Sequence, residues 1–274
     1  MAINCKGNLI DLSTPKVMGI LNLTPDSFYD GGKYKNESDI LSQVYMMLKF
    51  GATFIDIGAY SSRPDANHIS EEEELKRLLP IITLILKEFP EVFMSIDTFR
   101  SQVAKEGVEA GATLINDISA GKLDEHMLET VAKLKVPYIM MHMKGTPQTM
   151  QQQTNYENLT KDILFYFSER IAKAKALGIL DVIVDPGFGF AKTLEQNFEL
   201  LNQLELFKIL DKPILTGFSR KSMIYKTLGN SAKEALNGTS VLNTVALQKG
   251  ATILRVHDVK EAVECVKLIE QLKS

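Results

Sequence analysis

The stretch VMGILNLTPDSFYDGG, residues 17–32, joins an apolar run to an abrupt polar turn. Its first five residues have the length and apolar character of a strand that is buried on both faces. The remainder is rich in Asn, Asp, Ser, Pro and Gly, so it predicts a loop that leaves the carboxyl end of that strand. The amide, hydroxyl and carboxylate groups of this loop could bind a hard cation or a phosphate, although an ordinary surface turn has a similar composition.

The same pattern recurs along the chain. Seven more apolar runs end in polar or turn-forming residues, and they cover residues 52–58, 92–96, 113–115, 137–141, 181–184, 213–216 and 252–258. Segments with helical spacing fill the intervals between these runs. Eight strand-like runs that alternate with helices predict an α/β fold, the parallel (β/α)8 TIM barrel. A doubly wound open sheet shows the same alternation, so periodicity leaves it as the alternative.

Smaller features complete the predicted fold. Residues 4–15 predict a short N-terminal hairpin ahead of the first main strand, with its turn at Gly7-Asn8. Ser70, which four glutamates follow, predicts a helix N-cap, and Pro80 predicts a kink in that helix. Because the chain shows no break in composition and no interior linker, we expect residues 1–274 to form a single domain.

Composition and charge narrow the class of protein. Hydrophobic residues make up 45% of the chain and charged residues 24%, which is typical of a globular protein. A net charge of −3 argues against a nucleic-acid-binding surface. Cys5 and Cys265 form no Cys-x-x-Cys pair, so we expect free thiols in a reducing compartment. The sequence has neither a signal-peptide core nor an apolar run long enough for a bilayer, so we expect a cytoplasmic protein without a membrane or nucleic-acid partner.

Polar side chains collect where the predicted strands end. They are Asn22, Asp56, Asp97, Asn116, Asp185, Lys221, Arg255 and His257. In a closed parallel barrel these ends surround one mouth, where the active site is expected. Asp97, Asn116 and Asp185 could accept hydrogen bonds from a flat heterocycle with several N–H donors, and Lys221 could donate to an acceptor on that ring. For any one of these residues, an internal salt-bridge network with Lys221 or Arg255 is an equal alternative.

A second group of side chains is suited to an anion. Arg255 and His257 alternate along a strand and therefore share one face. With Arg63 and Asn22 they predict a pocket for phosphate or pyrophosphate, while a structural hydrogen bond at the strand end is the alternative for His257. We expect Phe190 to form an apolar wall across the mouth. Elsewhere, the sequence predicts His142 as a satisfied core group and His68 and His126 as surface residues.

Eight segments resemble a known family, and they are MGILNLTPDSFYDGG (18–32), SSRP (61–64), SIDT (95–98), INDI (115–118), MHMKGTP (141–147), DPGFGF (185–190), GFSRKS (217–222) and RVHDVKE (255–261). In collinear order over nearly the whole chain, they resemble the dihydropteroate synthases, a family of pterin-binding TIM barrels. The resemblance implies a transferase of folate biosynthesis that requires Mg²⁺. Such an enzyme joins p-aminobenzoate to 6-hydroxymethyl-7,8-dihydropterin diphosphate and releases 7,8-dihydropteroate and pyrophosphate. A pterin- or folate-binding methyltransferase and a catalytically silent pterin-binding paralogue are the alternatives.

The resemblance also implies site residues. The pterin site would comprise Asp97, Asn116, Met141, Asp185, Lys221 and Arg255. The pyrophosphate site would comprise Asn22, Arg63, Arg255 and His257, and Mg²⁺ would be held by Asn22 and Asp30. The aminobenzoate site would comprise Phe28, Ser62, Pro64, Phe190, Lys221 and Ser222. Catalytic roles would belong to Arg255, His257, Lys221, Asp30 and Arg63.

Two further features bear on the resemblance. The family tends to form homodimers through its last helices. An apolar stripe near the end of this chain permits a homodimer but does not require one, because such a stripe first of all predicts the helix face that packs on the barrel. That stripe comprises Val259, Ala262, Val263, Val266 and Ile269. The second loop departs from the family's usual Gly-Gly-Glu-Ser-Thr-Arg-Pro-Gly and reads GAYSSRPD over residues 58–65. Tyr60 stands in the place of an acid, Ser62 lacks the threonine methyl and Asp65 replaces a glycine, so we expect any difference from the family in aminobenzoate binding to arise there.

Overall fold

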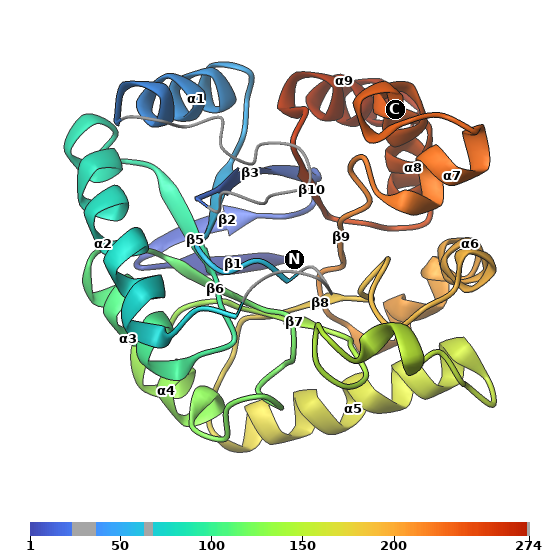
Figure 1. The fold of residues 1–274 in the computed structure, drawn as a ribbon, viewed down its shortest axis with the longest axis horizontal. Helices are drawn as coiled ribbons and strands as arrows, with labels where there is room; N and C mark the ends of the chain where they lie inside the picture. Colours follow the sequence, from blue (N-terminus) through green and yellow to red (C-terminus); the bar gives the residue numbers. More distant parts are fainter. Residues whose placement is uncertain (24–36, 63–67, 273–274) are drawn as a thin grey trace.

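The computed structural model describes residues 1–23, 37–62 and 68–272 (Figure 1). Within these residues, the main sheet consists of the parallel strands β3 (Lys16–Asn22), β4 (Phe54–Gly58), β5 (Phe93–Asp97), β6 (Leu114–Asp117), β7 (Tyr138–Met141), β8 (Val182–Asp185), β9 (Leu215–Thr216) and β10 (Ile253–Val256). Their hydrogen-bonded order is β8-β7-β6-β5-β4-β3-β10-β9. A parallel bridge between Val184 and Ile214 joins the two ends of this order. The predicted TIM barrel is therefore confirmed, because an open sheet would keep two unpaired edges.

Helices surround the barrel (Figure 1). They are α1 (Glu37–Lys49), α2 (Glu71–Glu88), α3 (Ser101–Glu109), α4 (Met127–Leu134), α5 (Leu159–Ala176), α6 (Leu194–Asn202), α7 (Ser222–Leu228), α8 (Leu236–Gln248) and α9 (Val259–Gln271). The Ser70 hydroxyl accepts the Glu73 N–H at 3.2 Å, which confirms the predicted cap of α2. The helix continues through Pro80 without interruption, and the kink at Pro80 stays a prediction. Within the described residues, no helix is both long and apolar enough to cross a membrane.

The predicted hairpin is present, with a small correction to its turn. Strands β1 (Ala2–Cys5) and β2 (Asn8–Asp11) pair antiparallel, and Cys5 lies opposite Asn8. The turn is therefore Lys6-Gly7, one residue earlier than predicted. Both residues have positive φ, +50° at Lys6 and +92° at Gly7, as the mirror-image turn favoured in two-residue hairpins requires.

The hairpin closes the amino end of the barrel. One buried apolar cluster contains Ile3, Cys5 and Leu12 from the hairpin segment together with Met18, Phe54, Leu114, Ile139, Ile183, Leu215 and Ile253 from seven of the strands. Phe93 of β5, the eighth strand, packs against this cluster. We call this group the barrel floor. Cys5 and Cys265 are both buried free thiols, as predicted, and burial raises the pKa of Cys5 to about 12.

Candidate active site

The polar end of the barrel arises from the strand register. Successive residues of a strand point to opposite faces, so a residue two positions beyond a floor residue also points inward. On β4, β6, β8 and β10 this position is occupied by Asp56, Asn116, Asp185 and Arg255. The barrel interior therefore changes from apolar to charged within one side-chain repeat, and the charged layer lies at the carboxyl ends of the strands. We call this layer the barrel mouth.

Arg255 organises the mouth. Its Nε donates to Asp56 Oδ2 at 2.6 Å, and its Nη2 donates to Asp97 Oδ2 at 2.7 Å. Asn116 Nδ2 donates to the same Asp56 oxygen at 3.0 Å. Side chains from β4, β5, β6 and β10 thus form one network. The salt-bridge arrangement that the sequence left open is present for Arg255, and it brings three of the predicted pterin-binding residues together.

Asp56 is a residue whose importance the sequence underestimated. It stood in the strand-end series but received no binding role. The structure shows that it holds both Arg255 and Asn116, and its side chain is fully buried. Its position two residues beyond the floor residue Phe54 is the sequence signal that could have placed it in the mouth.

The charges in this network affect one another. Burial raises the pKa of Asp97 above its ordinary value, and the Arg255 guanidinium opposes that rise. Burial alone would lower the pKa of Arg255, but Asp56 and Asp97 raise it overall, so Arg255 stays charged. The side chain of Asp97 is 24% exposed, whereas that of Asp56 is fully buried. Asp97 is therefore accessible to a ligand, and Asp56 acts mainly on its neighbours.

Lys221 and Asp185 lie at the ends of neighbouring strands. Lys221 precedes α7, and its Nζ donates to Phe188 O at 2.6 Å and lies 4.9 Å from the centre of the Phe190 ring. Burial lowers the pKa of Lys221 to about 8, and the Asp185 carboxylate opposes this change. Burial likewise raises the pKa of Asp185, which Lys221 opposes. Asp185 Oδ1 also accepts the Gly187 N–H at 2.8 Å. Each charge thus stabilises the other in a site where water is scarce.

His257 follows β10 and is held by Ser219. The His257 backbone N–H donates to Ser219 Oγ at 3.2 Å, and His257 Nδ1 lies 3.1 Å from the same oxygen. Burial, together with the Arg255 and Arg220 charges, lowers the pKa of His257 to about 3, so the ring is neutral. Because Oγ already accepts the backbone N–H, its own hydrogen can be donated to Nδ1. When the hydroxyl donates in this way, the neutral ring carries its proton on Nε2. The structural hydrogen bond predicted as an alternative therefore exists, and it fixes the ring.

The remaining predicted site residues have no hydrogen bond to the network described above, or they lie outside the described residues. Met141 is buried in a cluster with Ile118, Met143, Met150 and Ala191, against which Phe190 packs. Asn22, Ser62 and Ser222 are half-buried at the end of β3, after β4 and at the start of α7. Phe28, Asp30, Arg63 and Pro64 lie outside the described residues. The structure thus brings Asp97, Asn116 and Arg255 into contact, and Lys221 with Phe190. The roles of Arg63 in the pyrophosphate site and of Asp30 in the metal site therefore stay predictions.

Tyr60, the unusual residue of the second loop, is enclosed by other side chains. Its hydroxyl accepts from Gln148 Nε2 at 3.2 Å and lies 3.1 Å from His68 Nδ1. Its ring meets Phe99 edge-on at 5.1 Å, and the Arg100 guanidinium lies 5.3 Å from the ring centre. His68 is exposed, as predicted, and also contacts this cluster. The substitution therefore anchors the described beginning of the loop to the segments that follow β5 and β7.

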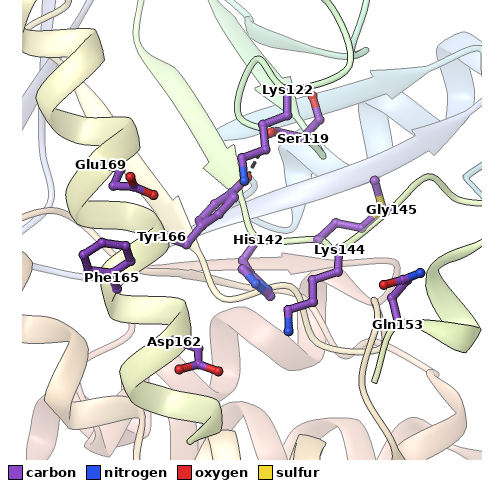
Figure 2. Close-up of a pocket in the computed structure, with 11 residues that line it drawn as sticks. Ser119, Lys122, His142, Lys144, Gly145, Gln153, Asp162, Phe165, Tyr166 and Glu169 are labelled. Atoms are coloured by element: carbon purple, nitrogen blue, oxygen red, sulfur yellow. Dashed lines mark hydrogen bonds between the residues drawn. The ribbon is translucent and has the colours of Figure 1, made fainter. Parts of the chain in front are cut away.

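A hollow of about 360 Å³ lies beside His142, between α5 and the segments that follow β6 and β7 (Figure 2). Its lining includes Lys122, Lys144 and Tyr166. No side chain of the strand-end series lines it, so we do not assign it to the barrel mouth. His142 itself is buried, with Nδ1 3.1 Å from Lys192 Nζ, which confirms that it is a satisfied core group.

Of the two predicted magnesium ligands, Asn22 and Asp30, Asn22 lies within the described residues. Within the described residues, no group of three or more His, Cys, Asp or Glu side chains could hold a metal ion. Mg²⁺, however, is usually bound through one or two protein oxygens together with substrate phosphates. Asn22 supplies a half-buried amide at the end of β3, opposite Gly58 of β4. The chemistry at this point therefore fits a magnesium ion that enters with a diphosphate.

Comparisons with known proteins agree with this geometry. The family model "Pterin binding enzyme" matches residues 18–257. Dihydropteroate synthase of Escherichia coli K12 is 42% identical over 272 residues, 98% of this chain and 96% of the relative. The Haemophilus influenzae enzyme of that name is 41% identical over 270 residues, 98% of each chain.

Solved structures match equally well. A Yersinia pestis dihydropteroate synthase in a sulfonamide drug complex has a TM-score of 0.96 at 41% identity, covering 100% of this chain and 99% of the other. A Xanthomonas albilineans dihydropteroate synthase with 4-aminobenzoic acid has a TM-score of 0.91 at 34% identity, covering 100% and 98%. The chain therefore belongs to the pterin-binding enzyme family, among the dihydropteroate synthases.

Proposed function

We propose that this protein condenses 6-hydroxymethyl-7,8-dihydropterin diphosphate with p-aminobenzoate, producing 7,8-dihydropteroate and pyrophosphate. The observation that carries the proposal is the charged barrel mouth, in which Arg255 bridges Asp56 and Asp97 beside Asn116. The convergence of these groups with Asp185 and Lys221 at the strand ends suits a polar, flat heterocycle with an anionic substituent.

The pterin ring binds to the acceptors of the mouth. Asp97 and Asp185 accept hydrogen bonds from its N–H groups, with Asn116 beside them and Lys221 donating to an oxygen or nitrogen of the ring. Asp56 is fully buried and supports the site indirectly, because it holds Arg255 and Asn116 through Oδ2. Met141 and Arg255 flank the two faces of the ring.

The reaction breaks the bond between the pterin methylene carbon and the diphosphate oxygen, and the aminobenzoate nitrogen forms a bond to that carbon. The pterin ring spreads the positive charge that develops on carbon, and the bond electrons leave with pyrophosphate. An aromatic amine is neutral near pH 7, so its nitrogen needs no strong base before attack and its proton passes to water afterwards.

The residues around the leaving group stabilise its charge. Arg255 carries five N–H groups, and the bonds to Asp56 and Asp97 use two of them, which leaves others to donate to the diphosphate. His257 is neutral and donates through Nε2, with Asn22 and Arg63 completing the anion site. Mg²⁺, held by Asn22 and Asp30, supplies further charge neutralisation on the diphosphate when it is bound. Aminobenzoate packs against Phe190, with Phe28, Ser62, Pro64, Lys221 and Ser222 completing its site.

Two broader features belong to the same proposal. We expect a homodimer formed through α8 and α9, because Val241 and Leu268 on these helices are 54% and 70% exposed. The apolar stripe of α9 belongs to the face that packs on the barrel, since Val259, Ala262, Val266 and Ile269 are buried in the core. Light scattering of the purified protein measures the oligomeric state, and a monomer at micromolar concentration would refute the dimer. Two buried free thiols suit a cytoplasmic location.

A direct assay tests the activity. Purified protein is mixed with the pterin diphosphate, p-aminobenzoate and Mg²⁺, and both dihydropteroate and pyrophosphate are measured over time. We expect the two products in equal amounts and no turnover when aminobenzoate or Mg²⁺ is omitted. Tight pterin binding without turnover would instead indicate a silent paralogue. Methyl transfer from a folate donor would indicate the methyltransferase alternative.

A further inference from the structure

Lys192 is a buried cation that the mechanism above does not use. It lies within the loop between β8 and α6 and is 5% exposed. Its Nζ contacts Gly187 O at 2.9 Å, Phe190 O at 3.0 Å and His142 Nδ1 at 3.1 Å. An ammonium group has three hydrogens, so these three acceptors match its donor capacity.

The loop that Lys192 holds is tightly wound. Gly187, Gly189 and Ala191 have φ values of +73°, +83° and +49°. A Cβ atom on Gly187 would lie 2.1 Å from His142 O, so the backbone passes directly against the end of β7. Such a turn exposes carbonyl groups that cannot pair within a helix or sheet. Gly187 O accepts the Phe190 N–H at 3.1 Å. Because the loop is largely buried, Phe190 O still needs a side-chain donor, which Lys192 supplies while also donating to Gly187 O.

The other side of the same loop faces the mouth. Phe188 O accepts from Lys221 Nζ, and the Phe188 ring packs edge-on against Phe218 at 4.8 Å. The Phe190 ring lies under the Lys221 amine. Two lysines therefore bind the loop. Lys192 donates to the carbonyls of Gly187 and Phe190, and Lys221 donates to the carbonyl of Phe188.

We propose that Lys192 is a positioning residue, whose three hydrogen bonds fix the β8–α6 loop so that Phe188 O orients Lys221 and Phe190 forms the wall of the aminobenzoate site. The inference rests on the proposed function, because its test measures the KM for aminobenzoate. Lys192 is proposed to contact neither substrate and to act on the aminobenzoate site through the loop.

The charges around Lys192 fit this role. Burial lowers the pKa of Lys192 to about 7; the Asp185 carboxylate opposes this change, and Lys221 and Lys144 add to it. Burial and the Lys192 charge lower the pKa of His142 well below its ordinary value, so the imidazole is neutral and its Nδ1 can accept. The neutral amine of Lys192 would have only two hydrogens for three acceptors. A protonated Lys192 therefore holds the loop most completely.

Two substitutions separate hydrogen bonding from packing. Lys192→Met keeps an unbranched side chain of similar length but no donor, whereas Lys192→Gln keeps an N–H₂ group. Steady-state kinetics at pH 6.5 should give a KM for aminobenzoate about tenfold higher in Lys192→Met, the size expected when buried acceptors lose their donor, with kcat changed by less than about threefold. Lys192→Gln should be intermediate. A packing role alone would instead make Lys192→Met the milder change.

Lys122→Met is the control for the loss of a lysine amine near His142, at an exposed position. Lys122 lines the hollow beside His142 and lies 4.4 Å from the centre of the Tyr166 ring, but it makes no hydrogen bond to the loop. Its KM values should stay within about twofold of wild type, below the smallest effect that a lost buried hydrogen bond gives. Two results would overturn the proposal. One is a Lys192→Met variant whose KM values for aminobenzoate and for the pterin diphosphate are both within about twofold of wild type. The other is a Lys192→Gln variant with a higher aminobenzoate KM than Lys192→Met.

A double variant covers the case in which Lys192→Met does not fold. His142→Leu with Lys192→Met replaces both members of one buried pair by apolar groups, which is nearly neutral for stability. The thermal midpoint should recover in part, while the aminobenzoate KM stays high because Phe190 O still lacks a donor and Gly187 O keeps only the Phe190 N–H. Recovery of KM together with stability would refute positioning. A wild-type protein that makes no dihydropteroate would refute the proposed function, whereas an active wild type with an equally active Lys192→Met refutes this inference alone.

Discussion

The floor and the mouth of the barrel occupy the same inward face of the same strands. On β8, Ile183 is fully buried against the hairpin end, and Asp185 lies two residues further along. Ile183 gains free energy from burial, whereas burial raises the pKa of Asp185 and therefore opposes its charged form. The comparison teaches that the floor side chains stabilise the folded state. The buried charges of the mouth lower the stability of the folded state, and they are retained because they bind a ligand.

The largest expected effect comes from the floor. Ile183→Ala should lower the free energy of unfolding by about 2–5 kcal/mol, through lost apolar contact and the cavity left behind. The kcat/KM of the folded enzyme should change by less than about threefold, because no floor side chain reaches the substrates. Urea unfolding and initial rates on the same preparation measure the two quantities.

The exposed Ile209 supplies the control for this change. It is 81% exposed, so Ile209→Ala should shift the free energy of unfolding by less than about 0.5 kcal/mol. An Ile183→Ala variant that is as stable as Ile209→Ala would break the comparison, because the floor would then carry no special share of the stability.

The matched change at the mouth is Asp185→Asn. It removes a charged acceptor that faces the pterin donors, so pterin affinity should fall about 10- to 100-fold, equivalent to about 1.5–3 kcal/mol. The folded-state pKa of Asp185 is raised, so its carboxylate disfavours folding above the ordinary carboxyl pKa, and Asn should leave stability equal or higher. Titration calorimetry with a pterin and thermal unfolding measure both. Unchanged pterin affinity would remove Asp185 from the site.

The strand pattern was readable from sequence because each buried strand is an unbroken apolar run followed by a polar turn. Strand-end residues such as Asp97, Asn116 and Arg255 were found for the same reason. Their partners were not predictable, since Arg255 and Asp56 are 199 residues apart in the chain and meet only when the barrel closes. Ser219 and Lys192 were missed because they act on other residues, and a single sequence carries no signal for such indirect contacts.

The hairpin turn illustrates the limit on a smaller scale. Gly7 correctly indicated a tight turn, but a two-residue turn can be placed on either side of it. The pairing of Cys5 with Asn8 decides the position, and it follows from the need to point Ile3 and Cys5 into the floor. Tertiary packing therefore set the register that local composition left open.

The next effect concerns Lys221, whose titration should change pterin affinity and the stability of the fold in opposite directions. The pKa of Lys221 is lowered to about 8, so its charge disfavours the folded state at lower pH, and that penalty is relieved as the pH rises from about 8 towards 10.5. Pterin affinity should move the other way and weaken by up to about tenfold one pH unit above the pKa, as the ammonium loses its proton.

Comparison with Lys221→Met isolates this effect. Pterin affinity and urea stability are measured from pH 7 to pH 9.5 in both proteins. The variant should bind pterin weakly throughout, and its stability should rise less with pH than that of the wild type. Equal pH slopes of stability in the two proteins would show that Lys221 does not carry a burial penalty.

The smallest expected effect tests how finely the mouth is arranged. Ser219→Ala removes the oxygen that contacts both the backbone N–H and Nδ1 of His257. The ring should then sample both tautomers, so that Nε2 carries the donated proton only part of the time, and kcat/KM for the pterin diphosphate should fall about three- to tenfold, the range for one neutral hydrogen bond. Affinity for a pterin without the diphosphate should be unchanged, because His257 acts on the leaving group. Equal losses for both ligands would mean that Ser219 supports the whole mouth, and the division between ring-binding and diphosphate-binding residues would then have to be abandoned.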